Sequence, residues 1–194
     1  PFGHPLNAGQ MGPRGNFVAS RLVKEADVIL ALGTRLGFNS TFYSYDNINR
    51  EAAIIQVELE PTAIGRFFPV DLGIWADAPT AARQITQALA DKAERNLAES
   101  WTRDFQAERQ AFLATRDANA VETHPIQPSG LFKALRGVIP HDAIVTMDAG
   151  TLCLQATDAM NYHTPGSLFT PLDFGLVGFS FACGLGAKLA QPKR

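Results

Sequence analysis

Residues 144–151 read IVTMDAGT, and residues 174–187 read FGLVGFSFACGLGA. The first stretch is an apolar run that passes into a turn containing glycine, which predicts a buried strand, a tight turn and the start of a helix. The second stretch alternates glycine with apolar residues, which predicts a loop that leads into a closely packed helix. Together they indicate an α/β fold with functional groups at the strand-to-helix junctions.

The turn at Asp148-Ala149-Gly150-Thr151 has the properties of a phosphate-binding turn. It carries little side-chain bulk, and the first N–H groups of the following helix, together with the helix dipole, favour an anion. Thr151 adds a hydroxyl donor. A tight turn between a strand and a helix can also use glycine for purely structural reasons, so the residues alone leave both interpretations open.

The same alternation of strands and helices runs through the first half of the chain. Continuous apolar runs at residues 26–32 (ADVILAL) and 53–59 (AIIQVEL) predict strands buried on both faces of a parallel sheet. A short third strand is expected at residues 73–76. Helices are expected at residues 16–24, with Asn16 as N-cap, and at residues 79–93. This order indicates a parallel sheet with right-handed crossovers.

Residues 94–121 differ in character, since they are charged and almost free of glycine and proline. Trp101, Phe105 and Phe112 fall near helical spacing, which predicts one amphipathic linking helix. Beyond it we expect further elements, namely strands at 143–148 and 167–170 and helices at 130–137, 150–160 and 177–190. The sequence therefore predicts two parallel-sheet units, at residues 1–95 and 128–194, joined by a linking helix and loop at residues 96–127.

Composition excludes several classes of function. The chain has 194 residues, 19% of them charged, and a net charge of −2, so neither nucleic acid nor a membrane is an expected partner. Its two cysteines lack a CxxC spacing, which suits reduced thiols and a cytoplasmic location. The four histidines lie far apart and predict no metal site.

Several stretches resemble one known family. Residues 4–6 (HPL), 25–35 (EADVILALGTR), 55–61 (IQVELEP) and 64–66 (IGR), followed by the two stretches quoted first, are similar to the acetolactate synthase large subunit and its relatives among the thiamine-diphosphate-dependent enzymes. The resemblance covers nearly the whole chain in the family's order. It implies an incomplete Rossmann-like central domain followed by the first part of the thiamine-diphosphate-binding fold.

The resemblance also implies roles for individual residues. The cofactor would contact Gly150, Thr151, Gly175, Leu176 and Val177. In this scheme the Gly175 carbonyl binds the exocyclic amine of the aminopyrimidine, and the Val177 side chain wedges the two cofactor rings into their reactive shape. Most relatives carry a larger apolar side chain than valine at this position.

Some members of the family hold FAD or ADP in the central domain. The corresponding contacts here would be at Gly33, Thr34, Arg35, Glu58 and Asp77, and a carboxylate at the end of a strand suits a ribose. Residues 36–47 (LGFNSTFYSYDN) depart from the acetolactate synthase pattern. A solvated strand end for Glu58 and a surface ion pair for Arg35 therefore remain alternatives to nucleotide binding.

The resemblance implies an enzyme that removes CO2 from a 2-keto acid and passes the remaining acyl unit to an acceptor. Residues 148–153 and 174–188 resemble sulfoacetaldehyde acetyltransferases about as well, and a non-catalytic nucleotide-binding module is a third interpretation. The family's Mg2+-binding element and its catalytic glutamate have no counterpart here, so no residue is assigned a catalytic or metal-binding role. We expect the chain to be a piece of a longer protein, inactive alone, and part of a homo-oligomer in which a neighbouring subunit completes the site.

Overall fold

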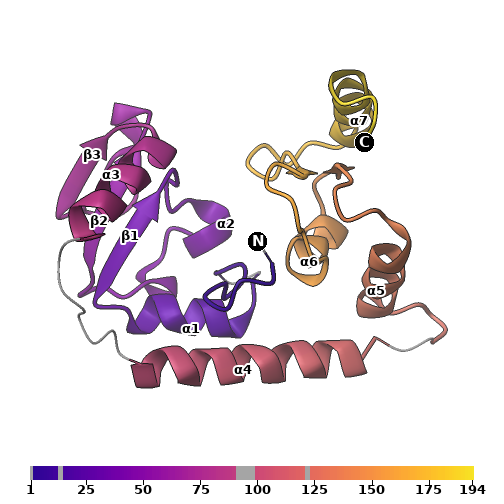
Figure 1. Ribbon diagram of the computed structural model, residues 1–194, viewed down its shortest axis with the longest axis horizontal. Helices are drawn as coiled ribbons and strands as arrows, with labels where there is room; N and C mark the ends of the chain where they lie inside the picture. The colour runs from indigo at the N-terminus through magenta and orange to yellow at the C-terminus, as the bar shows by residue number, and fades with distance from the viewer. Residues whose placement is uncertain (1, 13–14, 91–98, 121–122) are drawn as a thin grey trace.

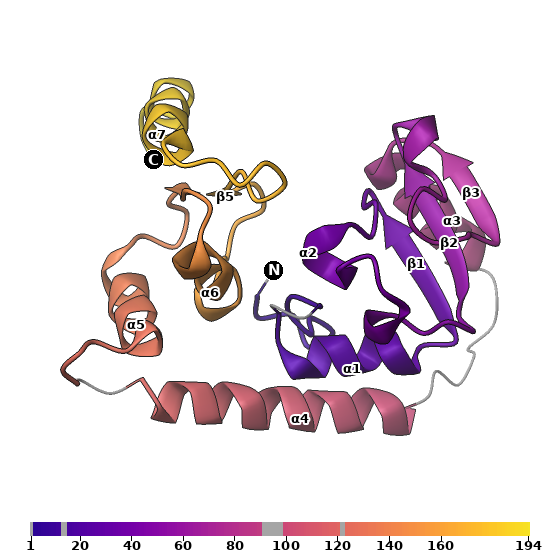
Figure 2. The ribbon, with the colours of Figure 1, turned by 180° about the vertical axis from the view of Figure 1, so that it is seen from behind.

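The computed structural model describes residues 2–12, 15–90, 99–120 and 123–194. Figure 1 shows two α/β units above the two ends of a long helix, α4 (Glu99–Ala118). This helix contacts α1 (Phe17–Glu25) in the first unit and α5 (Pro128–Val138) in the second. Seen from behind in Figure 2, the N-terminal loop lies between the two units. Within the described ranges, no helix is long and apolar enough to span a membrane.

The first unit is built on a three-stranded parallel sheet. Its strands are β1 (Val28–Leu32), β2 (Ala53–Glu58) and β3 (Leu72–Trp75), in that order across the sheet. α1 begins where the Asn16 side chain accepts a hydrogen bond from the N–H of Ala19 at 2.9 Å. α3 (Ala78–Ala90) follows β3. The predicted α/β class and the parallel pairing of the strands are confirmed.

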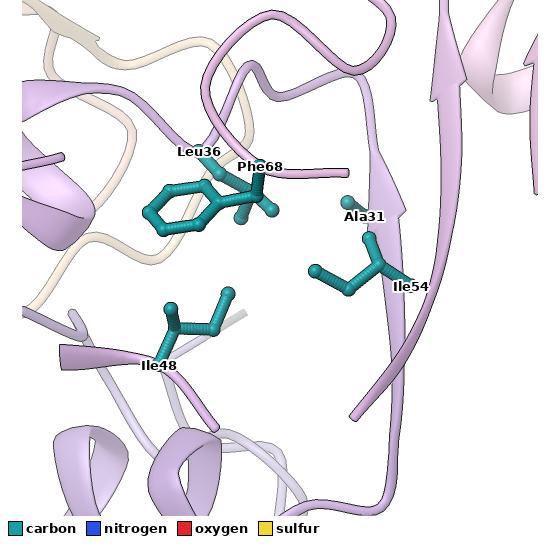
Figure 3. Close-up of a cluster of buried hydrophobic side chains, with 5 residues drawn as sticks. All are labelled: Ala31, Leu36, Ile48, Ile54 and Phe68. Carbon is teal, nitrogen blue, oxygen red and sulfur yellow. The ribbon is translucent and has the colours of Figure 1, made fainter. Parts of the chain in front are cut away.

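Short helical turns complete this unit. η2 (Pro61–Ala63) begins at a proline, which suits the first position of a helix, whereas α2 (Phe38–Thr41) and η1 (Tyr45–Asn47) were not predicted. The main cluster of buried side chains lies between one face of the sheet and these turns (Figure 3). It consists of Ala31, Leu36, Ile48, Ile54 and Phe68, each at most 5% exposed.

The expectation that residues 26–32 are buried on both faces is wrong. β1 is the edge strand of the described sheet, and its side chains alternate between the two faces. Ala31 faces the core, whereas Val28, Leu30 and Leu32 on the opposite face are 55%, 44% and 39% exposed. The apolar run indicates that both faces of the strand are suited to burial. In the described part of the chain, only one face is covered.

α4 behaves as the predicted amphipathic link. Phe105 is 4% exposed, and Phe112 packs edge-on against Phe17 of α1 with ring centroids 5.6 Å apart. Arg21 of α1 forms an ion pair with Glu108 at 2.8 Å. The helix lies inside the predicted link at residues 96–127, although the domain boundaries themselves stay a prediction.

The second unit places α6 (Thr151–Ala159) against α5 around a core of Phe132, Ala156 and Met160. Two short strands, β4 (Val145–Thr146) and β5 (Leu168–Phe169), pair in parallel, and α7 (Phe179–Ala190) ends the unit. Burial beside this core raises the pKa of Tyr162 to about 12. Cys153 and Cys183 are both free thiols.

Candidate cofactor-binding site

Asp148 joins the two stretches that the sequence singled out. One carboxylate oxygen accepts a hydrogen bond from the N–H of Gly178 at 2.9 Å, and the other accepts one from the N–H of Ser180 at 2.6 Å. The N–H of the adjacent Ala149 donates to the Leu176 carbonyl at 3.0 Å. The turn after β4 and the loop before α7 are therefore one hydrogen-bonded structure.

The charge of Asp148 is stabilised by these bonds. Hydrogen bonds from the backbone N–H of Ser180, and then of Gly178, hold the pKa of the Asp148 carboxyl below its ordinary value. An anionic group at a helix N-terminus also interacts favourably with the helix dipole. Asp148 thus occupies the start of α7, so this helix end is not free for a ligand.

The start of α6 is open instead. Its first N–H groups have no partner within the helix, and Gly150, which precedes it, offers no side-chain cap. Gly150 has a φ of 139°, a value that favours glycine, and a Cβ built on it would meet no atom within 4 Å. Both Gly150 and Thr151 are exposed. This end of α6 can accept an anionic group such as a diphosphate.

The loop at residues 174–177 presents apolar side chains to its surroundings. Phe174 and Val177 are each 84% exposed, and Leu176 is 51% exposed. Gly175 and Gly178 adopt positive φ values of 65° and 93°, which glycine reaches without strain. An apolar loop exposed beside an open helix N-terminus can hold a ligand that has both a ring system and a charged tail. The predicted cofactor residues Gly150, Thr151, Gly175, Leu176 and Val177 are therefore brought together.

A larger cavity, of about 870 Å³, lies beyond the ends of β1 and β2, and Phe174 of the apolar loop is among its lining residues. Of the predicted nucleotide contacts, it is lined by Gly33, Thr34, Arg35 and Glu58. Asp77 does not line this cavity. Its carboxylate accepts hydrogen bonds from the N–H and hydroxyl of Thr80 at 3.0 Å and 2.8 Å, which lower its pKa and cap α3.

Two of the predicted nucleotide contacts in this cavity already have partners. Arg35 Nη2 lies 2.6 Å from Asp173 Oδ2, so the ion pair considered as an alternative for Arg35 is present. Glu58 accepts a hydrogen bond from the N–H of Leu59 at 2.9 Å, at the end of its strand. A nucleotide would bind beside these interactions or replace them.

Sequence reasoning missed Gln56, which organises the loops around this cavity. Its side chain is 2% exposed and donates to the carbonyls of Thr34 and Ala63 at 3.1 Å and 3.3 Å. It also accepts a hydrogen bond from the N–H of Gly65 at 2.9 Å. The available signal was a single amide side chain inside the apolar run AIIQVEL. In the ranges that the structure describes, no three His, Cys, Asp or Glu side chains gather as metal ligands.

Comparison with known proteins finds a family match for the first unit and similar proteins for the whole chain. Residues 1–85 match the family described as "Thiamine pyrophosphate enzyme, central domain". The whole chain is similar to the sulfoacetaldehyde acetyltransferases of Rhodobacter capsulatus and Castellaniella defragrans, with 33% and 30% identity. It is also similar to the acetolactate synthase large subunit of Lactococcus lactis, with 25% identity over all of this chain.

The chain spans 36% of the length of the two acetyltransferases and 32% of the acetolactate synthase subunit. The similarity extends through the junction of Asp148 with the loop before α7, since it covers 100% of the chain in all three relatives. The resemblance inferred from the sequence is confirmed: residues 1–85 match the central-domain model of the thiamine pyrophosphate enzymes, and the whole chain is similar to sulfoacetaldehyde acetyltransferases and acetolactate synthase large subunits.

Proposed function

We propose that this chain contributes part of the cofactor site of a thiamine-diphosphate-dependent transferase or lyase. The observation that carries the proposal is the junction at Asp148, which ties the exposed apolar loop at residues 174–177 to the open N-terminus of α6. A diphosphate and a two-ring cofactor need these two features side by side.

Thiamine diphosphate, when bound, supplies a nucleophilic thiazolium carbon. The chain's own residues bind and orient it. The first N–H groups of α6 and the Thr151 hydroxyl bind the diphosphate, and the Gly175 carbonyl accepts a hydrogen bond from the aminopyrimidine. Val177 fixes the position of one ring against the other, since its exposed side chain is held on a loop whose backbone is anchored by Asp148.

The remaining groups belong to other parts of the protein in this proposal. Mg2+ would be held by a segment outside these 194 residues, and a glutamate from a neighbouring subunit of a homo-oligomer would protonate the aminopyrimidine. The chain on its own is therefore expected to be inactive. We propose that the complete protein acts on a small keto acid or aldehyde.

The similar enzymes suggest two candidate substrates. Sulfoacetaldehyde is favoured by 30% to 33% identity to enzymes named as sulfoacetaldehyde acetyltransferases, and pyruvate is the alternative from a relative at 25% identity. The full-length protein, loaded with thiamine diphosphate and Mg2+ and supplied with an acyl acceptor such as inorganic phosphate, should consume one of the two. Loss of sulfoacetaldehyde without loss of pyruvate supports the acetyltransferase, whereas CO2 release from pyruvate supports the carboligase. Turnover of neither, in protein shown to bind the cofactor, contradicts both assignments.

The cavity of about 870 Å³ beside Gly33 and Glu58 suggests a second ligand, FAD or ADP. Its volume lies in the range of small-molecule sites, and it opens at the ends of parallel strands, where nucleotides bind. Calorimetric titration of the full-length protein with each nucleotide tests this candidate. If neither nucleotide shows saturable binding, the nucleotide assignment is wrong and the Arg35–Asp173 ion pair is the role of these residues.

A further inference from the structure

Another cavity, of about 460 Å³, lies between the N-terminal loop, α4 and the C-terminal end of α6. The residues that matter for the argument are Gly9, Gln10, Arg109, Asp158 and Tyr162, all of which line it. Its lining residues Thr157 and Asp158 lie six and seven residues after the start of α6 at Thr151, so this cavity begins about 9–10 Å along the helix from the open N-terminus, at a rise of 1.5 Å per residue. It is therefore separate from the candidate cofactor site.

Arg109 is a buried charged residue of this cavity with an unsatisfied hydrogen-bond donor. It is 7% exposed, and among the described residues its Nη1 has no hydrogen-bond partner. The nearest carboxylate oxygen, Asp158 Oδ1, lies 4.0 Å from Nη1, which is too far for a hydrogen bond. A buried guanidinium with an unused N–H group is unfavourable, because charged groups taken out of water need both a counter-charge and hydrogen bonds.

Asp158 does not supply this acceptor, because its Oδ1 lies 4.0 Å from Nη1 and is hydrogen-bonded to another residue. Asp158 Oδ1 accepts a hydrogen bond from Asn16 Nδ2 at 3.0 Å, and its backbone carbonyl accepts one from Arg116 Nη1 at 3.2 Å. Burial lowers the pKa of Arg109, and Asp158 opposes that change, although an arginine stays charged at neutral pH. Arg109 Nη1 thus has a nearby charge but lacks a directed acceptor.

The position of the guanidinium is fixed by its neighbours. A Cβ built on Gly9 would lie 2.9 Å from Arg109 Nη2 and 2.5 Å from Asn16 Nδ2, so the glycine lets the N-terminal loop pack closely over both side chains. On the other side, the Arg109 guanidinium carbon lies 5.4 Å from the ring centroid of Phe112. Little freedom remains for Arg109 to turn towards solvent.

We propose that this cavity binds a small anion through a carboxylate or phosphate group that accepts hydrogen bonds from Arg109. The planar guanidinium suits both groups, since each can offer two oxygens to parallel N–H donors. The volume is sufficient for a small organic molecule, and the Met160 and Leu168 side chains supply apolar wall for the rest of it. This site would lie where the central unit, α4 and the second unit meet.

The test is calorimetric titration of the full-length protein with two probes, inorganic phosphate and succinate, at an ionic strength kept constant with chloride. We expect saturable binding of at least one probe, and the probe that binds tells a phosphate ligand from a carboxylate ligand. In Arg109→Gln the dissociation constant should rise about tenfold or more, as expected for loss of a charge-assisted hydrogen bond. Arg103→Gln is the matched control, since Arg103 lies exposed on the same helix and does not line the cavity.

A second variant covers the case in which Arg109→Gln does not fold. Gln10→Glu keeps nearly the same shape and adds a negative charge to the cavity wall, so it should weaken binding of the same probe by a similar factor. Phosphate bound at the start of α6 would be unaffected by this change. No saturable binding of either probe, or an unchanged dissociation constant in Gln10→Glu, overturns the proposal.

Discussion

Arg35 and Asp173 connect the two α/β units directly, with Arg35 Nη2 2.6 Å from Asp173 Oδ2. Arg35 stands just after β1, and Asp173 immediately precedes the exposed loop at residues 174–177. The pair therefore links the larger cavity of the first unit to the candidate cofactor loop of the second. Because the two side chains are 50% and 62% exposed, we expect the pair to influence loop position more than stability.

Arg35→Gln should lower the free energy of unfolding by no more than about 1 kcal/mol, the usual limit for an exposed ion pair. The same change should weaken thiamine diphosphate binding by the full-length protein, because the loop loses its anchor to the first unit. Urea unfolding and cofactor titration measure the two effects, with Arg103→Gln as a control for loss of an exposed arginine. A loss of several kcal/mol with unchanged cofactor affinity would show that the pair is structural.

Asp148 gives a prediction for pH. Its pKa is held below the ordinary carboxyl value by the N–H groups of Ser180 and Gly178, so it stabilises the folded protein above the unfolded pKa of about 3.9. That stabilisation is lost as the pH falls through the lower, folded value. The melting temperature of Asp148→Ala should therefore lie below that of the wild type at neutral pH, and the two should converge in acid.

The matched control is Asp142→Ala, which removes an exposed carboxylate from the same unit. Thermal unfolding at a series of pH values gives the comparison. A difference between Asp148→Ala and the wild type that persists unchanged in strong acid would mean that the carboxylate charge has no part in holding the two loops together.

Gln56→Leu tests whether the buried amide holds the loops around the larger cavity. Leucine fills a similar space but leaves the carbonyls of Thr34 and Ala63 and the N–H of Gly65 without this partner. We expect a loss of about 1–3 kcal/mol in the free energy of unfolding, the cost of stranding buried polar groups. Gln87→Leu, on the exposed face of α3, should change it by less than about 0.5 kcal/mol, and equal losses in both variants would contradict this role.

Sequence patterns predicted most helices and strands well, because the signals for these elements lie within or next to them in the sequence. Asn16 directly precedes the helix that it caps, and Pro61 is the first residue of η2. The apolar runs at β1 and β2 also gave the strands and their parallel pairing. Burial was harder to predict, since whether Val28 and Leu30 are covered depends on elements far away in the sequence.

The hydrogen bonds that build the candidate sites could not be predicted from local sequence patterns. Asp148 and Ser180 are 32 residues apart, and Arg35 and Asp173 are 138 residues apart, so no periodicity connects them. Family resemblance suggested that the turn at Gly150 and the loop at Val177 serve one cofactor, but it did not indicate the carboxylate that joins the two segments. Arg109 was read only as part of an amphipathic helix, because its burial depends on the N-terminal loop packing over it.

Val177→Ala separates a cofactor role from a structural one. A buried valine would lose about 1 kcal/mol or more on truncation, but Val177 is 84% exposed, so we expect the free energy of unfolding to change by less than about 0.5 kcal/mol. If the side chain holds the cofactor rings in their reactive shape, kcat of the full-length enzyme should fall by about tenfold or more, where each tenfold corresponds to about 1.36 kcal/mol of activation free energy.

Val138→Ala is the matched control for this change, because Val138 is 79% exposed at the end of α5, away from the loop. Melting temperature and kcat should be measured together on both variants. A fall in kcat in Val177→Ala alone, with both melting temperatures unchanged, is the result that a wedge under the cofactor requires. Normal turnover by Val177→Ala would remove the role assigned to this loop, because an exposed valine that contributes neither to folding nor to catalysis has no contact with the cofactor to lose.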